Sequence, residues 1–409
     1  MDQDPDVIVV DGAILAPKRV ARTVVRVVAV LFLVALRSVS RILTVRIIVV
    51  GFHRFGHLAL EPEQFLARSE SKQTRFQLDL WSLGNHSNQT NRYLANKWAG
   101  RVNAVPSWVV DALVRAGDRF PRLACDRPQL SIHGPANGLD RTAPQLSFTP
   151  EEVASGSEQL RALGIDPSLP YVCLIVRDSS HYLSLGHEES PGYSYLNCDI
   201  SMFRETAVAL ANSGFQVLRM GAGSERELGL KHPGVMDYAK SPLRSEFLDV
   251  YIAGTCTFAV STQTGPDAVC LAFRRPVFYV DVVRFSQFFF GTKLAWWNPA
   301  TIMVNGKRMS MRQIVNHEVF WLEDPDDFIR HGISIERSSP AEIARMALAF
   351  ADVVKSGLQM PAQYTADAEQ VRRILREGLG DRGLAIFGEP TAMMNPAFLA
   401  DNARWFLNE

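Results

Sequence analysis

Residues 257–281 read TFAVSTQTGPDAVCLAFRRPVFYVD, and this stretch decides the fold class. Two apolar runs, Phe258–Val260 and Val277–Val280, have the length and the β-branched and aromatic content of buried strands. Between the two runs, a polar turn leads into a short apolar segment with the length of a helix. The order strand, turn, helix, strand predicts a parallel β-α-β unit of an α/β protein.

The turn inside this stretch has the composition of a helix start. Thr264 offers a capping hydroxyl, Gly265 is conformationally permissive, and Pro266 suits the first helical turn. Free backbone amides at such a point attract phosphate. Asp267 follows in the first turn and would compete with an anion there. We therefore expect that Asp267 turns aside to bind a sugar hydroxyl, or that the anion lies elsewhere.

The composition is that of a globular protein. The 409 residues include 43 basic and 43 acidic side chains and are 47% hydrophobic, which is enough material for two domains. The balanced charge does not favour nucleic-acid binding over the whole surface. The five cysteines lack a C-x-x-C pair, which indicates a reducing compartment and buried thiols in place of zinc ligands or nucleophiles.

Residues 18–41, KRVARTVVRVVAVLFLVALRSVSR, predict a basic amphipathic helix. The longest uncharged run, residues 27–36, is shorter than the roughly 20 residues that a membrane-spanning helix needs. We expect the helix to lie on an anionic inner-membrane surface or to pack on the protein's own core. The membrane is favoured because so wide an apolar face is unfavourable unless covered. Helical spacing gathers five arginines within an arc of about 100°, namely Arg19, Arg22, Arg26, Arg37 and Arg41.

Strand and helix patterns alternate from Val45 onward, and the alternation restarts at Tyr171 after an irregular segment at residues 121–147. Capping boxes at Thr149 and Ser339 mark two helix starts. The chain is therefore divided into an N-terminal extension with the basic helix (1–44), a first Rossmann-like domain (45–165), a second Rossmann-like domain (166–355) and a helical tail (356–409).

Several motifs together resemble a bacterial family of surface-polysaccharide glycosyltransferases of the two-domain GT-B type. They are RFGHLALEPEQFL (54–66), VRDSSHYL (176–183), YLNCDI (195–200), LRMG (218–221), residues 238–252, and STQTG (261–265) followed by RPV (275–277). The STQTG turn also resembles the donor-site turn of heptosyltransferases. The resemblance implies two Rossmann-like domains that face a cleft, with the acceptor bound by the first domain and a nucleotide-sugar donor by the second.

The implied activity is transfer of a sugar from a nucleotide-sugar to a lipid-linked or cell-surface polysaccharide acceptor. The implied location is the cytoplasmic face of the inner membrane, held peripherally through Lys18–Arg41, or the cytoplasm. A nucleotide-sugar epimerase of the same fold and a non-catalytic nucleotide-binding or scaffold protein are the alternatives.

Sugar transfer needs groups that stabilise a departing diphosphate. Basic side chains at the ends of buried strands could supply that charge in place of a metal. No D-x-D motif stands at a strand end, so we expect no metal and no cofactor besides the nucleotide-sugar substrate. The predicted donor and phosphate residues are Arg177, Arg219, Gly221, Lys240, Ser261, Thr262, Thr264, Gly265 and Asp267.

Sugar transfer also needs a base for the acceptor hydroxyl. His57 is the first choice because the loop 53–57 follows the first buried strand, and Asp178, Glu188 and Glu61 are alternatives. The aromatic residues between Phe285 and Trp297 are predicted to be core rather than a stacking platform. The predicted acceptor and sugar residues are His53, Arg54, Gly56, Tyr195 and Asn197.

Overall fold

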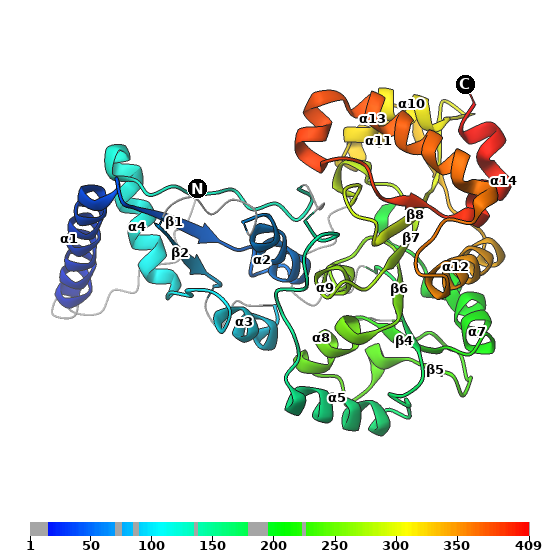
Figure 1. Cartoon of the computed structure of the whole chain (residues 1–409), viewed down its shortest axis with the longest axis horizontal. Helices are drawn as coiled ribbons and strands as arrows, with labels where there is room; N and C mark the ends of the chain where they lie inside the picture. The colour runs from blue at the N-terminus through cyan, green and yellow to red at the C-terminus, as the bar shows by residue number, and fades with distance from the viewer. Residues whose placement is uncertain are drawn as a thin grey trace.

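The computed structural model describes residues 15–69, 76–84, 90–134, 138–178, 195–222 and 226–408, with the side chains of 15–22 and of Pro325 left aside. It confirms an α/β protein with a large parallel sheet (Figure 1). Seven strands form this sheet, and every neighbouring pair is parallel. In spatial order they are β12 (Met393–Met394), β8 (Ala295–Pro299), β7 (Val277–Val282), β6 (Phe258–Ser261), β3 (Tyr171–Ile175), β4 (Gln216–Met220) and β5 (Val235–Met236).

The strand order reverses in the middle of this sheet. From β3 the chain adds β4 and β5 on one side, and from β6 it adds β7 and β8 on the other. Strands β3 and β6 are neighbours, with Ile175 opposite Ser261 at their carboxyl ends. Such a reversal leaves a crevice at the carboxyl ends of the two strands, where open α/β sheets bind their ligands.

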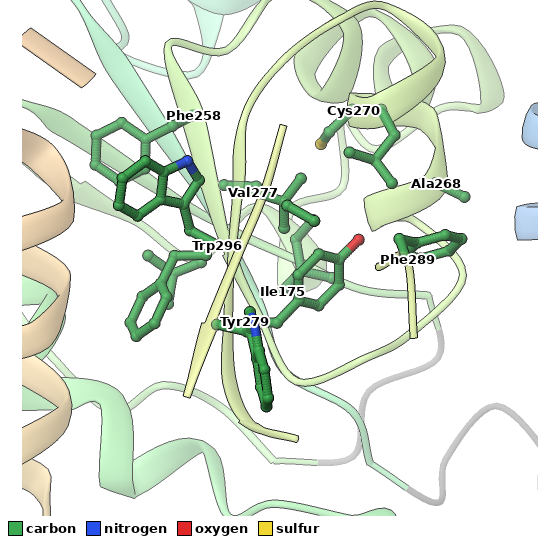
Figure 2. Packing of buried hydrophobic residues seen from close by; sticks show 14 of the residues in the cluster. Ile175, Phe258, Ala268, Cys270, Val277, Tyr279, Phe289 and Trp296 are labelled. Atoms are coloured by element: carbon green, nitrogen blue, oxygen red, sulfur yellow. The ribbon is translucent and has the colours of Figure 1, made fainter. Parts of the chain in front are cut away.

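Apolar side chains cover both faces of the large sheet. Figure 2 shows Phe258 and Trp296 on one side of the strands, and Tyr279 and Phe289 on the other. The first two pack against Phe350 of α12 (Pro340–Lys355). The aromatic residues predicted as core are buried, which confirms that prediction: Phe285, Phe288, Phe290, Trp296 and Trp297 are 0% exposed and Phe289 is 7% exposed.

Helices flank this sheet in two layers. Helices α7 (Arg204–Asn212) and α12 (Pro340–Lys355) pack together on one face, and α8 (Glu246–Thr255) and α9 (Asp267–Ala272) on the other (Figure 1). The capping boxes predicted at Thr149 and Ser339 are both formed. They begin α5 (Pro150–Ala162) and α12. The other elements of this part are α5 (Pro150–Ala162), α10 (Met311–Asn316), α11 (Pro325–Arg330), α13 (Thr365–Phe387), α14 (Pro396–Phe406), and a small antiparallel sheet of β9 (Thr301–Val304), β10 (Lys307–Arg308) and β11 (Ile333–Glu336).

The N-terminal part has a smaller sheet in the described residues. Strands β1 (Leu43–Val49) and β2 (Phe76–Ser82) are parallel, and single bridges join β1 to Asp126 and β2 to Ala104. Residues 102–105 thus contribute one bridge to this sheet. The helices of this part are α1 (Leu15–Val39), α2 (Phe55–Ser69), α3 (Arg92–Ala99) and α4 (Ser107–Arg119).

The part with the two-stranded sheet and the part with the seven-stranded sheet touch through α2 and α9. Glu63 of α2 is 0% exposed and pairs with Arg274, with 2.7 Å between Oε1 and Nη2. Gly56 at the start of α2 lies so close to Gly265 that a Cβ on Gly56 would be 3.1 Å from the Gly265 Cα. Any substrate cleft between the parts therefore lies beside this backbone contact. The boundaries after residues 44, 165 and 355 stay predictions, and the tail after 355 contributes β12 to the large sheet.

Candidate functional site

The carboxyl ends of β3 and β6 are tied together at the strand-order reversal. The amide of Arg177 donates to Thr262 Oγ1 at 2.9 Å, and the amide of Thr262 donates to the Ile175 carbonyl at 3.1 Å. Arg177 and Asp178 follow β3, and the turn from Thr262 to Gly265 follows β6. The structure thus brings these predicted residues together at the place where the sheet topology favours a ligand.

The start of α2 carries a histidine–glutamate pair. The sequence suggested a loop through residue 57, but α2 begins at Phe55, so His57 lies in the first helical turn. His57 Nδ1 lies 2.7 Å from Glu61 Oε1, and Glu61 Oε2 accepts the Gly51 amide at 2.8 Å. Glu61 is 6% exposed. A buried carboxylate on Nδ1 favours the tautomer that leaves Nε2 as a proton acceptor.

Gly51 is required for this arrangement. A Cβ at Gly51 would lie 2.9 Å from His57 Cβ and 3.1 Å from His57 Nδ1. Any larger residue at the end of β1 would therefore displace the imidazole. The backbone at Gly51 both admits the ring and donates to the carboxylate that orients it.

His133 lies near this pair and was missed in the sequence. Burial lowers the pKa of His133 to about 3, and the nearby His57 and Arg284 add to the effect. The imidazole is therefore neutral at physiological pH. Its buried Nδ1 has no hydrogen-bond partner among the described residues, and its ring lies 5.4 Å from the Phe289 ring. The segment 121–147 has no periodicity, so nothing in the sequence singled out this histidine.

Arg284, just beyond β7, adds a cation to the same region and was also missed. Its Nε donates to the Tyr195 hydroxyl at 3.2 Å, and its carbonyl accepts from Gln263 Nε2 at 3.2 Å. Gln263 has a φ of 56°, a left-handed backbone that is uncommon for a residue other than glycine. Such backbone strain is concentrated at functional sites. The signal in the sequence was the position of Arg284 directly after a buried strand.

Asp267 faces the protein interior. It is 3% exposed, and its Oδ2 accepts the Ser261 hydroxyl at 2.7 Å and the Thr264 amide at 2.8 Å. Burial raises its pKa from 3.8 to about 7. The carboxyl group thus takes up the amide that was expected to bind phosphate, and it is not presented to a sugar. The expectation that Asp267 turns aside to bind a sugar hydroxyl is therefore not met in this structure.

Arg219 is a buried structural residue. Its guanidinium is 1% exposed, and Nη1 donates to Asp237 Oδ1 at 3.1 Å and to the Arg226 carbonyl at 3.0 Å. Nη2 lies 3.7 Å from Asp178 Oδ2. Arg219 therefore supports Asp178 from within the protein and is not presented to an anion, in contrast to its predicted role.

The remaining predicted residues do not all lie at this centre. Lys240 is exposed and ends a short turn after β5, at the far edge of the sheet, and Gly221 follows β4. His53 and Arg54 are exposed just before α2. Asn197 precedes Cys198, whose amide donates to the Arg177 carbonyl at 2.9 Å. Glu188 lies outside the described residues.

Three solved structures are similar to this chain at low identity. They are ADP-heptose lps heptosyltransferase II from E. coli (13% identity, 64% of this chain and 92% of that chain, TM-score 0.40), the glycosyl transferase family 9 protein from Veillonella parvula (9%, 70% and 95%, 0.40) and the iron-containing dodecameric glycosyltransferase TibC from enterotoxigenic E. coli (13%, 77% and 77%, 0.36). No protein-family model and no curated protein matches the chain. Likenesses this distant identify no residue of the site.

Proposed function

We propose that this protein is a glycosyltransferase of the GT-B type that moves a sugar from a nucleotide-sugar to an acceptor hydroxyl. The observation that carries the proposal is the position of the His57–Glu61 pair. The His57 imidazole is 27% exposed, is oriented by a buried carboxylate, and lies in the helical turn that touches Gly265, beside the reversal point of the parallel sheet. That position joins a proton acceptor to the crevice in which such sheets bind their ligands.

The proposed chemistry uses the two sides of the site differently. His57 Nε2 takes the proton of the acceptor hydroxyl while its oxygen attacks the anomeric carbon of the donor sugar. The bond from that carbon to the diphosphate oxygen breaks, and the diphosphate leaves with the bonding electrons. Glu61 stabilises the imidazolium that forms. Arg177 and Arg284 stabilise the charge on the diphosphate.

The narrower features belong to the same proposal. The acceptor is a lipid-linked or cell-surface polysaccharide chain, the enzyme works at the cytoplasmic face of the inner membrane, and no metal takes part. The motifs shared with surface-polysaccharide glycosyltransferases support these assignments, as do the arginines beside the site, which can supply the charge of a metal.

A ligand screen tests the proposal. The melting temperature is measured with UDP-, GDP-, TDP-, CMP- and ADP-sugars, each with and without EDTA, and release of free nucleotide is then followed with the sugar that binds. We expect one nucleotide class to raise the melting temperature with or without EDTA. Arg177→Gln should weaken this shift, whereas Arg226→Gln, at a residue whose side chain is 74% exposed, should not.

Three outcomes would contradict parts of the proposal. If no nucleotide-sugar shifts the melting temperature, the donor site is wrong. A shift that EDTA abolishes would contradict the metal-independent mechanism. Conversion of the bound sugar without nucleotide release would indicate an epimerase, and binding without any turnover in the presence of glycan acceptors would indicate a non-catalytic protein.

A further inference from the structure

Helix α1 has one covered face. Ala29 is 5% exposed and Leu33 is fully buried, and both pack against Val110, Leu113 and Ala116. This seam joins α1 to α4 at the end of the molecule that lies away from the large sheet (Figure 1). The alternative that this helix packs on the protein's own core therefore holds for one face of α1.

The opposite face of α1 is apolar and exposed. Val24, Val28 and Leu31 are 54%, 58% and 63% exposed, respectively. At about 100° per residue these positions point away from Ala29 and Leu33. Further exposed apolar residues flank these three positions, and they are Val27, Phe32, Val34 and Val39. We call this set of seven residues the outer face of α1.

The apolar surface continues beyond the helix. Ile42, three residues after α1 ends, is 68% exposed, and Phe76 is 76% exposed. Leu43, the residue after Ile42, pairs with Phe76, so Ile42 and Phe76 lie at the same end of the small sheet. The fold thus brings an exposed aromatic residue of β2 to the end of the sheet at which β1 follows α1.

The charge around this surface has one sign. Residues 15–41 contain no acidic side chain. Arg26, Arg37 and Arg41 are exposed. By helical geometry Arg26 and Arg37 lie toward the α4 side of α1 and not on its outer face, and Arg41 follows the end of the helix. Apolar residues therefore project outward and cations lie behind them, toward the body of the protein. That order matches the acyl and headgroup layers of an anionic bilayer.

We infer that the outer face of α1, with Ile42 and Phe76, docks in the plane of an anionic lipid bilayer. The apolar side chains enter the boundary between headgroups and acyl chains, and the arginines contact the anionic headgroups. A second copy of this chain is a poorer occupant, because a twofold contact would bring two acid-free basic helices together. The inference stands on α1 and its neighbours and does not depend on the proposed activity.

Vesicle flotation of the full chain tests this inference. Vesicles of phosphatidylcholine with phosphatidylglycerol are compared with phosphatidylcholine alone, each at low and high salt. Wild type should partition to the anionic vesicles, and high salt should weaken the partition. The double variant Val28→Glu with Leu31→Glu should lower the fraction bound to anionic vesicles by about tenfold or more, because two apolar contacts with the bilayer are lost. Leu169→Glu with Ile329→Glu adds the same charge at residues exposed elsewhere and should leave it unchanged.

A second pair of variants keeps the apolar face intact. Arg26→Gln with Arg37→Gln should weaken binding to anionic vesicles by about fivefold for each arginine and leave binding to phosphatidylcholine unchanged. Failure of wild type to float with anionic vesicles would overturn the inference, as would equal losses in the two glutamate pairs. Light scattering decides between occupants: a wild-type dimer that Val28→Glu with Leu31→Glu converts to a monomer, without vesicle binding, would assign the outer face to a second copy.

Discussion

Glu61 and Asp267 are two buried carboxyl groups at the same junction, and they are used in different ways. Each accepts a backbone amide, Glu61 from Gly51 and Asp267 from Thr264. The second partner of Glu61 is the partly exposed His57, whereas the second partner of Asp267 is the buried Ser261 hydroxyl. The hydrogen bonds of Glu61 therefore link a buried carboxylate to a side chain of the site, whereas those of Asp267 stay within its own turn. A buried acid near a site is functional only if its hydrogen bonds lead to an accessible group.

Burial also changes the electrostatics of the Asp267 carboxyl group. Among the described residues no cation is bonded to the Asp267 carboxyl group, and burial raises its pKa to about 7. A carboxyl group that is partly protonated at neutral pH repels phosphate less than a full negative charge would. The turn from Thr262 to Gly265 can therefore remain compatible with an anionic ligand nearby, although the Thr264 amide is already taken.

The largest expected effect is the loss of kcat when the partner of Glu61, His57, is replaced. His57→Ala removes the accessible end of the pair and should lower kcat by about 10²–10⁴, the usual contribution of a general base. His57 is 27% exposed, so the melting temperature should change little. The measurement is steady-state transfer with the donor found in the ligand screen. His331→Ala, at a histidine 32% exposed and far from the site in the chain, is the matched control. Retention of kcat within a few-fold would assign the proton transfer to Asp178 or another group.

The next effect is the contribution of Asp267 to the pH dependence of the free energy of unfolding. The folded pKa of about 7 exceeds the ordinary value of 3.8, so the folded state binds the proton more tightly than the unfolded state. This contribution to stability is fully present below about pH 4 and is lost as the pH rises through 7, by about 4 kcal/mol in all. Asp267→Asn should remove that part of the pH dependence in urea unfolding between pH 4 and 8.

The matched control for this experiment is Asp352→Asn, at a side chain that is 78% exposed. It should leave the wild-type pH profile unchanged. If Asp267→Asn declines with pH as steeply as wild type, Asp267 is ionised in the folded protein and its charge reaches the ligand site. That result would restore the expectation that Asp267 acts on the substrate.

The sequence predicted the strands of the large sheet better than the directions of side chains. The apolar runs near Phe258 and Val277 became β6 and β7 because each is bounded by turn residues. Strand β8 was missed because its tryptophans, Asn298 and Pro299 break any alternation. The position of the β6 turn followed from chain order and sheet topology. The inward direction of Asp267 depends on its hydrogen bonds to Ser261 and Thr264, which no sequence pattern specifies.

The smallest effect is expected for Glu61→Gln, which keeps the shape of the pair and removes its charge. A glutamine has one acceptor oxygen where Glu61 uses two, for the Gly51 amide and for His57 Nδ1. If the oxygen keeps the Gly51 amide, the amide nitrogen faces Nδ1 and favours the tautomer with the proton on Nε2. The base is then in the wrong form, and its imidazolium has lost its counter-charge.

We therefore expect kcat to fall by about 10- to 100-fold in Glu61→Gln, less than in His57→Ala, while KM for the donor stays the same. Glu158→Gln, at an exposed position of α5, is the control for removal of one acid. The double variant His57→Ala with Glu61→Gln should be no slower than His57→Ala alone, because Glu61 acts only through the imidazole. Additive losses would show that Glu61 contacts the substrate side directly, and an unchanged kcat in Glu61→Gln would reduce this carboxylate to the same closed, structural role as Asp267.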